Sequence, residues 1–400
     1  MRDIIIWGTG VIARSLYYKI LSGGGICCQV KYFVDNAPIQ TFYDKDVFRP
    51  TRENCSPYLV VVASTIHYDE IAVQLTEFGL QELKDFIPYQ ALGKEVVLVH
   101  GNCHKQMIEE YLKTSRTFAE KFWIYPIPMI QHNSRGYIKE HLLRNCDVFI
   151  YQDIQENNPY DKRLSAEYLS AKVCKRRICI PNVFGFGRFL FPQAVLGRND
   201  SEWHNPTGQE IPGGLFNYRD GNIDRLWTGG ERNIHKIAEY LEGPIYEKAE
   251  MEERLIQCFE KMKEREKLWD IKIVDYIENR YQEEQMFYEP AHPCNNILRK
   301  ISEGIAETLG IEKDEIGEIT ISFGVSEMPI YNCVKETLGL KYGRKYIRDI
   351  APLEQSKLIG GDMDLLEYCK EYCYWCFGYY SPMCAPKGPH PLEPPGSDVK

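Results

Sequence analysis

The stretch "DIIIWGTGVIARSLYYKIL" at residues 3–21 decides the fold of the N-terminal part of the chain. Its first apolar residues predict a buried strand, a turn with two glycines follows, and the apolar residues beyond it recur at helical spacing. A second predicted strand, "VKYFVDN" at residues 30–36, ends beside an acidic residue. This order is typical of a Rossmann-like domain, in which the glycine turn approaches a phosphate and the acidic residue binds a ribose hydroxyl. Gly8, Gly10 and Asp35 are therefore candidates for binding a nucleotide.

The next predicted elements, the strand "YLVVVAS" at residues 58–64 and the helix "HYDEIAVQLTEFGL" at residues 67–80, continue the same pattern. Residues 1–90 resemble the small Rossmann-like domains attached to bacterial sugar-modifying and polysaccharide-biosynthesis enzymes. That resemblance implies a nucleotide or nucleotide-sugar ligand. A scaffold without a ligand is the alternative, because a tight strand-to-helix connection needs glycine even where nothing binds.

A second domain is expected to begin at residue 94, where "EVVLVHGNCHKQMIEEYL" (residues 95–112) again reads as strand, tight turn and helix. Strands and helices alternate from there to residue 182, which indicates a second parallel sheet. We therefore predict an α/β chain with two Rossmann-like parallel-sheet domains, the second with a large helical insertion or lid. The expected division is residues 1–93, 94–350, and a Cys/aromatic-rich segment with a disordered tail at 351–400.

Ligands of such sheets bind at the carboxyl ends of the strands, where residues 100–104, Gln152 and Asn182 would meet. At a helix N-terminus Cys103 would face N–H groups and a helix dipole that favour a thiolate. His104 could act as a cation or as a general base, and the N–H groups could hold a phosphate or an oxyanion. The bland alternative is packing, since adjacent helical side chains point about 100° apart.

Five motifs occur in the order typical of the WcbI-type family of polysaccharide-biosynthesis proteins, whose members are regarded as acetyltransferases. They are "GNCHKQMIEEYL", "CDVFIYQDIQENNPYD", "ICIPNVFGFGRFLFPQ", "QMFYEPAHPCNNILRKISEGIAETLGI" and "ISFGVSEMPIYNCVKETLGL". The resemblance covers roughly residues 96–345. It implies coenzyme A-dependent transfer of an acetyl or similar acyl group to a sugar of a capsule or surface polysaccharide.

The same resemblance assigns site residues. The family's Gly-Asn-Cys turn falls on Gly101, Asn102 and Cys103, its strand-end glutamine on Gln152, and its His-Pro pair on residues 292–293. This chain departs from the pattern at residue 104, where many relatives carry glutamine. It also reads "GFGRFLFP" where a Gly-Tyr-His-Pro-like run is usual, so no histidine is available there.

Two routes for the transfer are open. In the first, Asn102 and helix N–H groups hold the thioester oxygen while His104 or His292 removes the proton of the sugar hydroxyl. In the second, Cys103 attacks first and forms an acyl-enzyme. Competing functions are a nucleotide-sugar oxidoreductase and a non-catalytic nucleotide- or sugar-binding module of a polysaccharide assembly. The oxidoreductase is disfavoured because the sequence offers no suitably placed Tyr-x-x-x-Lys pair.

Composition limits the partners. The formal net charge of −9 without a dense Lys/Arg block disfavours nucleic acid. The four-residue apolar run before Gly8 is too short for a signal peptide or a membrane span, so we expect a cytoplasmic protein with no membrane span and mostly reduced thiols. The expected partners are a small-molecule acyl donor and a sugar acceptor, and an oligomer remains open.

The C-terminal stretch "EYCKEYCYWCFGYYSPMC" contains four closely spaced cysteines that could hold zinc or an iron–sulfur cluster. The run lacks a paired CxxC partner, and its aromatic residues indicate a packing segment instead. We therefore predict no metal site and keep these cysteines as the candidate ligands: Cys369, Cys373, Cys376 and Cys384. The proline-rich residues 385–400 are expected to be disordered.

Overall fold

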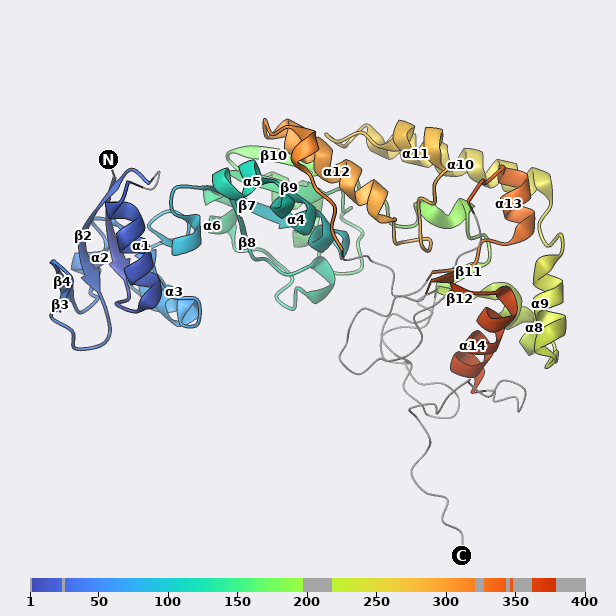
Figure 1. Ribbon diagram of the computed structural model, residues 1–400, viewed down its shortest axis with the longest axis horizontal. Helices are drawn as coiled ribbons and strands as arrows, with labels where there is room; N and C mark the ends of the chain where they lie inside the picture. The colour runs from blue at the N-terminus through green and yellow to red at the C-terminus, as the bar shows by residue number, and fades with distance from the viewer. Residues whose placement is uncertain are drawn as a thin grey trace, which may run out of the picture. The chain divides into compact units, whose positions relative to one another are not determined.

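The computed structural model describes residues 2–23, 26–196, 218–320, 327–342, 346–347 and 362–378 of the 400-residue chain (Figure 1). The chain divides into two compact units. The first unit comprises Met1–Asn182, Lys263–Asp275 and Asn295–Ile321. The second comprises Val183–Met262, Tyr276–Cys294 and Ser322–Lys400.

The first unit begins with a six-stranded sheet in the order β3-β4-β2-β1-β5-β6. Strand β1 is parallel to both β2 and β5, as the strand–turn–helix–strand pattern predicts. The only antiparallel pairing of this sheet is the short hairpin β3–β4 at its edge, which was not predicted. The elements are β1 (Arg2–Trp7), α1 (Val11–Leu21), β2 (Cys28–Val34), β3 (Thr41–Phe42), β4 (Lys45–Phe48), α2 (Arg52–Cys55), β5 (Leu59–Val62), α3 (Tyr68–Glu77) and β6 (Phe86–Pro88).

Both faces of this sheet are covered by buried apolar side chains. Successive side chains of β1 point to opposite faces and so enter two different cores. Ile4 and Ile6 pack in one core with Leu16 of α1. Ile5 packs in the core on the other face with residues of α3, including Leu75. The near-continuous apolar run of β1 thus reflects a strand covered on both sides by helices.

The second sheet of the first unit has four parallel strands in the order β10-β9-β7-β8. Strand β7 lies between β9 and β8, so its carboxyl end opens at the middle of the sheet. Its elements are β7 (Glu95–His100), α4 (His104–Thr114), α5 (Arg116–Lys121), β8 (Phe122–Tyr125), α6 (Glu140–Asn145), β9 (Val148–Gln152), α7 (Ala166–Ser170), β10 (Arg176–Ile180) and α12 (Asn295–Thr308). The last of these helices packs against α4 (Figure 1).

The predicted α/β fold with parallel sheets is confirmed by these two sheets. The boundary expected at residue 93 falls between the last strand of the first sheet and the first strand of the second. As a division into separate domains it stays a prediction. None of the helices in the described part of the chain is long and apolar enough to cross a bilayer.

The remaining elements are mainly helical. They are β11 (Ala194–Leu196), β12 (Tyr218–Asp220), α8 (Gly221–Thr228), α9 (Ile234–Glu242), α10 (Lys248–Glu266), α11 (Val274–Arg280), α13 (Asn332–Leu338), β13 (Tyr346–Ile347), β14 (Asp362–Met363) and α14 (Leu365–Phe377). Helices α10 and α11 lie within residues 247–284, the polar stretch for which the sequence predicts a helical lid or hairpin, and that role stays a prediction.

The cysteine-rich segment forms helix α14, which packs on α9 in the second unit. Cys369, Cys373 and Cys376 are all buried on this helix, and burial raises the pKa of the Cys369 thiol well above its ordinary value. Within the described ranges, no group of three or more His, Cys, Asp or Glu side chains is arranged to hold a metal ion. The fourth candidate ligand, Cys384, and the predicted tail lie outside the described residues.

Candidate functional site

The centre of the candidate site is the turn between β7 and α4. Gly101 is required there by a close contact rather than by its own backbone angles. A Cβ atom on this residue would lie 2.5 Å from Oε1 of Gln152, whose side chain is fully buried at the carboxyl end of β9. The turn is also fixed from another side, because the N–H of Ile130 donates to the carbonyl of Gly101 at 2.9 Å.

Asn102 organises the turn through three hydrogen bonds. Its N–H donates to Oε1 of Gln152 at 2.7 Å, and its Nδ2 donates to Oδ1 of Asn182 at 3.3 Å. Its Oδ1 accepts the N–H of His104 at 3.0 Å and so caps the first turn of α4. Three predicted rim residues, Asn102, Gln152 and Asn182, are therefore brought together.

The orientation of the Gln152 amide determines the tautomer of His104. Because Oε1 accepts a backbone N–H, Nε2 is the atom that faces Nδ1 of His104, at 3.3 Å. A glutamine NH₂ group only donates, so Nδ1 is the acceptor, and a neutral imidazole then carries its proton on Nε2. The His104 side chain is fully buried. Its Nδ1 lone pair is thus already used within the protein.

The first N–H groups of α4 also have acceptors inside the turn. Besides the N–H of His104, that of Lys105 donates to the Asn102 carbonyl at 3.0 Å and that of Gln106 to the Cys103 carbonyl at 3.2 Å. These donors are the ones expected to hold an oxyanion. The arrangement leaves the side-chain amide of Asn102, with one of its two protons bonded to Asn182, as a further donor at this position.

Cys103 differs from its neighbours in exposure. It is half-buried at the N-cap position of α4, whereas Gly101, Asn102 and His104 are buried. Its side chain makes no capping hydrogen bond to the helix. Cys103 is therefore the least buried residue of this turn, and it lies next to the side-chain amide of Asn102.

Two buried polar groups support the carboxyl ends of the neighbouring strands. Nε2 of His100 lies 2.9 Å from the carbonyl of Leu164, and burial lowers the pKa of His100 to about 4, so the ring is neutral at pH 7. The carboxylate of Asp153 pairs with Arg265 at 3.2 Å. Both residues act on the shape of the site through these contacts, while Nδ1 of His100 is buried without a hydrogen-bond partner in the described part of the chain.

The three candidate residues of the first sheet also gather at one edge of that sheet. Gly8 has φ +115°, a conformation that favours glycine, and its N–H donates to the carbonyl of Val34 at 2.8 Å. The next residue, Thr9, donates its hydroxyl to Oδ2 of Asp35 at 2.7 Å. Gly10 is the N-cap residue of α1. The expected arrangement is present, with the acidic side chain held by the turn itself.

His292 lies in the second unit and carries a partner that the sequence did not reveal. Its Nδ1 is 2.6 Å from Oε1 of Glu289, whose carboxylate is buried. Residues 287–293 form a tight loop, in which the N–H of Tyr288 donates to the carbonyl of His292 at 2.9 Å. Gly187 allows this loop to pack closely, because a Cβ atom there would lie 2.8 Å from the carbonyl oxygen of Glu289.

Comparison with known proteins supports the family resemblance over residues that include four of the five motifs. The family model of the polysaccharide biosynthesis enzyme WcbI matches residues 96–314, more than half of the chain. A solved structure of WcbI, described as a novel polysaccharide biosynthesis enzyme, is similar with a TM-score of 0.52 and 17% sequence identity. The match covers 62% of this chain and 80% of that one, and it shows a shared fold. That structure is described as native protein without a disulfide bond between coenzyme A and one of its cysteines.

No curated protein matches this chain. The family match includes the turn at residues 101–103, the carboxyl end of β9 and the loop at residues 287–293. The predicted family is thereby confirmed: the chain belongs to the WcbI family of polysaccharide biosynthesis enzymes.

Proposed function

We propose that this enzyme transfers an acyl group, in the simplest case acetyl, from a coenzyme A thioester to a hydroxyl group of a polysaccharide sugar. The observation that carries the proposal is the half-buried Cys103 thiol at the start of α4, held between a capped turn and a fully buried glutamine. A solved WcbI structure is described as native protein without a disulfide bond between coenzyme A and one of its cysteines. That description supports our proposal that the thiol end of coenzyme A approaches Cys103 in this chain.

The direct route is preferred over an acyl-enzyme. In this route the sugar oxygen attacks the thioester carbonyl, the new C–O bond forms, and the C–S bond breaks. The coenzyme A thiolate leaves and takes up a proton from the protonated base. A cysteine acyl-enzyme would itself be a thioester, so its formation gains little over the donor. The Nδ2 group of Asn102 is the donor that we assign to the developing oxyanion.

The two histidines receive different roles. His104 is proposed as a positioning residue, because its Nδ1 lone pair accepts from Gln152 and its ring is fully buried. His292 is proposed as the general base, because its Nδ1 lies 2.6 Å from the buried Glu289 carboxylate, whose negative charge favours a protonated Nδ1 with a basic Nε2. A carboxylate in this position also stabilises the imidazolium that forms after proton removal.

For the first sheet we propose a nucleotide or nucleotide-sugar ligand at the Gly8–Gly10 turn. The support is geometric: the two glycines lie in the turn just before α1, and the hydroxyl of Thr9 in that turn donates to Asp35. Such a ligand would present an activated sugar to the same enzyme.

The decisive experiment measures coenzyme A binding and thiol release from acetyl-CoA in the presence of polysaccharide-derived sugars. Cys103→Ala is expected to weaken coenzyme A binding, and Cys103→Ser tests the route: retained acyl transfer by Cys103→Ser supports direct transfer, and its loss supports an acyl-enzyme. Cys174→Ser is the matched control, because Cys174 is an exposed cysteine of the same unit. Absence of coenzyme A binding by the wild-type enzyme would refute the proposal.

A further inference from the structure

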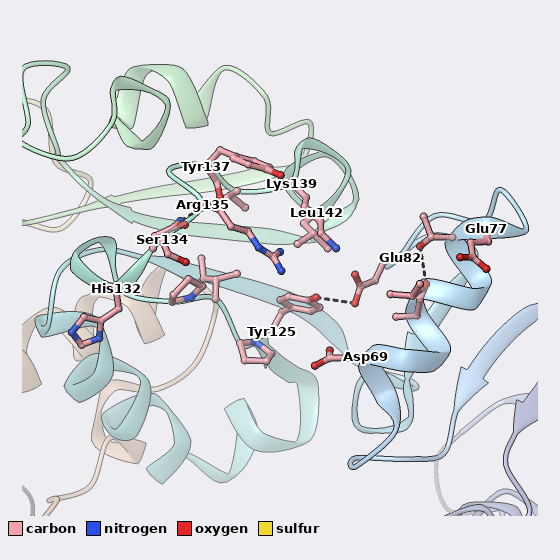
Figure 2. Close-up of a pocket in the computed structure, with 18 residues that line it drawn as sticks. Asp69, Glu77, Glu82, Tyr125, His132, Ser134, Arg135, Tyr137, Lys139 and Leu142 are labelled. Atoms are coloured by element: carbon pink, nitrogen blue, oxygen red, sulfur yellow. Dashed lines mark hydrogen bonds between the residues drawn. The ribbon is translucent and has the colours of Figure 1, made fainter.

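A cavity, which we call the α3 cavity, lies in the first unit and is not lined by the residues assigned to the proposed acyl transfer. Its volume is about 650 Å³, within the range of small-molecule sites. One wall is helix α3 with the following Glu82, and the other is the segment of residues 125–142 that follows strand β8 (Figure 2). The first wall lies outside the residues that match the family model, so the cavity exists only because this chain carries the N-terminal sheet.

The base of the α3 cavity contains a buried carboxylate, Glu82, which is 4% exposed. Its Oε1 accepts the hydroxyl of Tyr68 at 2.7 Å and that of Tyr125 at 2.8 Å, and Figure 2 shows the second of these bonds. Burial raises the pKa of this carboxyl, but the hydrogen bonds of the two tyrosines and the nearby His141, whose Nε2 lies 4.0 Å from Oε2, outweigh burial and leave the pKa below its ordinary value. The group is therefore a fixed, ionised acceptor.

The rim of the α3 cavity carries charges of both signs. Asp69 and Glu77 come from α3, and Arg135 and Lys139 come from the opposite wall. Figure 2 shows the Arg135 side chain directed from its wall toward Glu82 and Asp69. In the part of the chain that the structure describes, the side chains of these four rim residues form no ion pair. Donors and acceptors thus face a common space from two walls.

This combination selects a ligand class. Three carboxylates against two permanent cations disfavour a polyanion such as a nucleoside diphosphate, while hydroxyl groups can donate to the carboxylates and accept from Arg135 and Lys139. The tyrosine ring at residue 125 and the prolines at 126 and 128 provide apolar surface for the C–H face of a sugar ring. We propose that the α3 cavity binds a neutral or amino sugar of the polysaccharide substrate.

The α3 cavity is also connected to the turn that carries Cys103. The segment that forms its second wall includes Ile130, whose N–H donates to the carbonyl of Gly101 at 2.9 Å. A shallower cavity of about 450 Å³ shares residues 132–135 with the first and continues along the same segment. Sugar binding would therefore act on a segment that is bonded directly to the candidate site.

The test is ligand-observed saturation-transfer NMR with the full-length protein in the absence of coenzyme A, so its result does not depend on acyl transfer. The probes are glucose, galactose, glucosamine and, as the polyanion, UDP. At least one sugar is expected to show saturation transfer. Asp69→Asn and Arg135→Ala should each weaken its binding at least fivefold. Both side chains are exposed, so neither change should impair folding.

Two matched controls come from neighbouring positions that do not line the α3 cavity. Glu70→Gln changes the exposed carboxylate next to Asp69, and Arg144→Ala removes an exposed arginine of α6 that pairs with Glu140. Both should bind the sugar as the wild type does. The proposal is overturned if no sugar shows saturation transfer, if the two cavity variants bind like the controls, or if Asp69→Asn and Arg135→Ala weaken UDP instead of the sugar.

Discussion

Oε1 of Gln152 accepts the backbone N–H of Asn102 at 2.7 Å and thereby joins the carboxyl end of β9 to the turn after β7. This one bond fixes which end of the amide faces His104, and so determines which imidazole nitrogen is the acceptor. It also explains the glycine at residue 101, because the glutamine side chain occupies the space that a Cβ atom would need. The conformation of the turn, the tautomer of His104 and the position of the end of β9 therefore depend on one another.

Gln152→Met is expected to destabilise the protein and weaken coenzyme A binding. Methionine fills a similar volume but leaves the Asn102 N–H without its acceptor, and a buried polar group left unpaired costs roughly 1–3 kcal/mol. Urea unfolding and calorimetric titration with coenzyme A would measure both effects. Gln81→Met, at an exposed position of the same unit, is the control and should leave both unchanged. Equal behaviour of the two variants would contradict the coupling.

Replacing Gly101 and Gly10 by alanine should affect the stability of the protein to different extents. In Gly101→Ala the new Cβ would lie 2.5 Å from Oε1 of Gln152, so the glutamine must move, and overpacking of this kind costs about 1–3 kcal/mol. In Gly10→Ala no heavy atom lies within 4 Å of the new Cβ and φ is −83°, so only the weaker N-cap preference of alanine remains and the thermal midpoint should fall less than in Gly101→Ala. Nucleotide affinity measured on Gly10→Ala tests the ligand proposed for the first sheet, since a bound phosphate would meet the added methyl group. An unchanged affinity would argue against a phosphate at that turn.

Glu289→Gln should lower kcat while leaving KM for the acyl donor nearly unchanged. Glutamine keeps the size of the side chain beside Nδ1 of His292 but offers no negative charge to the imidazolium, so we expect a loss of about tenfold or more, within the usual range of general acid–base catalysis. His292→Ala should lose more. Glu283→Gln, which removes an exposed pairing with Lys341, is the control for surface charge. If Glu289→Gln keeps the wild-type rate of thiol release, the proposed base is wrong.

The sequence predicts the parts of this structure that depend on local pattern. The apolar runs and glycine turns around residues 8 and 101 predict both strand–turn–helix connections, which the fold confirms. The β3–β4 hairpin gave no such signal, because its turn places Tyr43 at φ +57° where glycine or asparagine is usual.

The partners of the site residues depend on elements that are far apart along the chain or on loop geometry. Gln152 meets Asn102 across 50 positions, and the pairing of Glu289 with His292 needs a tight loop that no periodicity indicates. The carboxylate of Glu82 is a similar case, because its partners come from α3 and β8. A pattern along one segment cannot reveal a contact that is created by packing two segments together.

The buried carboxylate of Asp220 predicts a pH dependence for the second unit. It caps α8 by accepting the N–H groups of Asn222 and Ile223, and it accepts the hydroxyl of Tyr331. Burial raises the pKa of Asp220 from 3.8 to about 6, because desolvation outweighs these hydrogen bonds. The native state then holds the proton more tightly than the unfolded chain, so this group stabilises fully below pH 4 and its contribution is lost as the pH rises through 6.

Asp220→Asn should remove that dependence. Asparagine is an equally good N-cap residue and does not titrate, so the variant keeps the cap without the cost of a buried charge. The difference in unfolding free energy between wild type and variant should therefore change by about 2 kcal/mol from pH 4 to pH 7, in favour of the variant at the higher pH. Urea unfolding followed by circular dichroism across that range measures it. Parallel stability curves for the two proteins would mean that Asp220 is ionised in the native state at pH 4 and that Tyr331 and the helix amides compensate its burial completely.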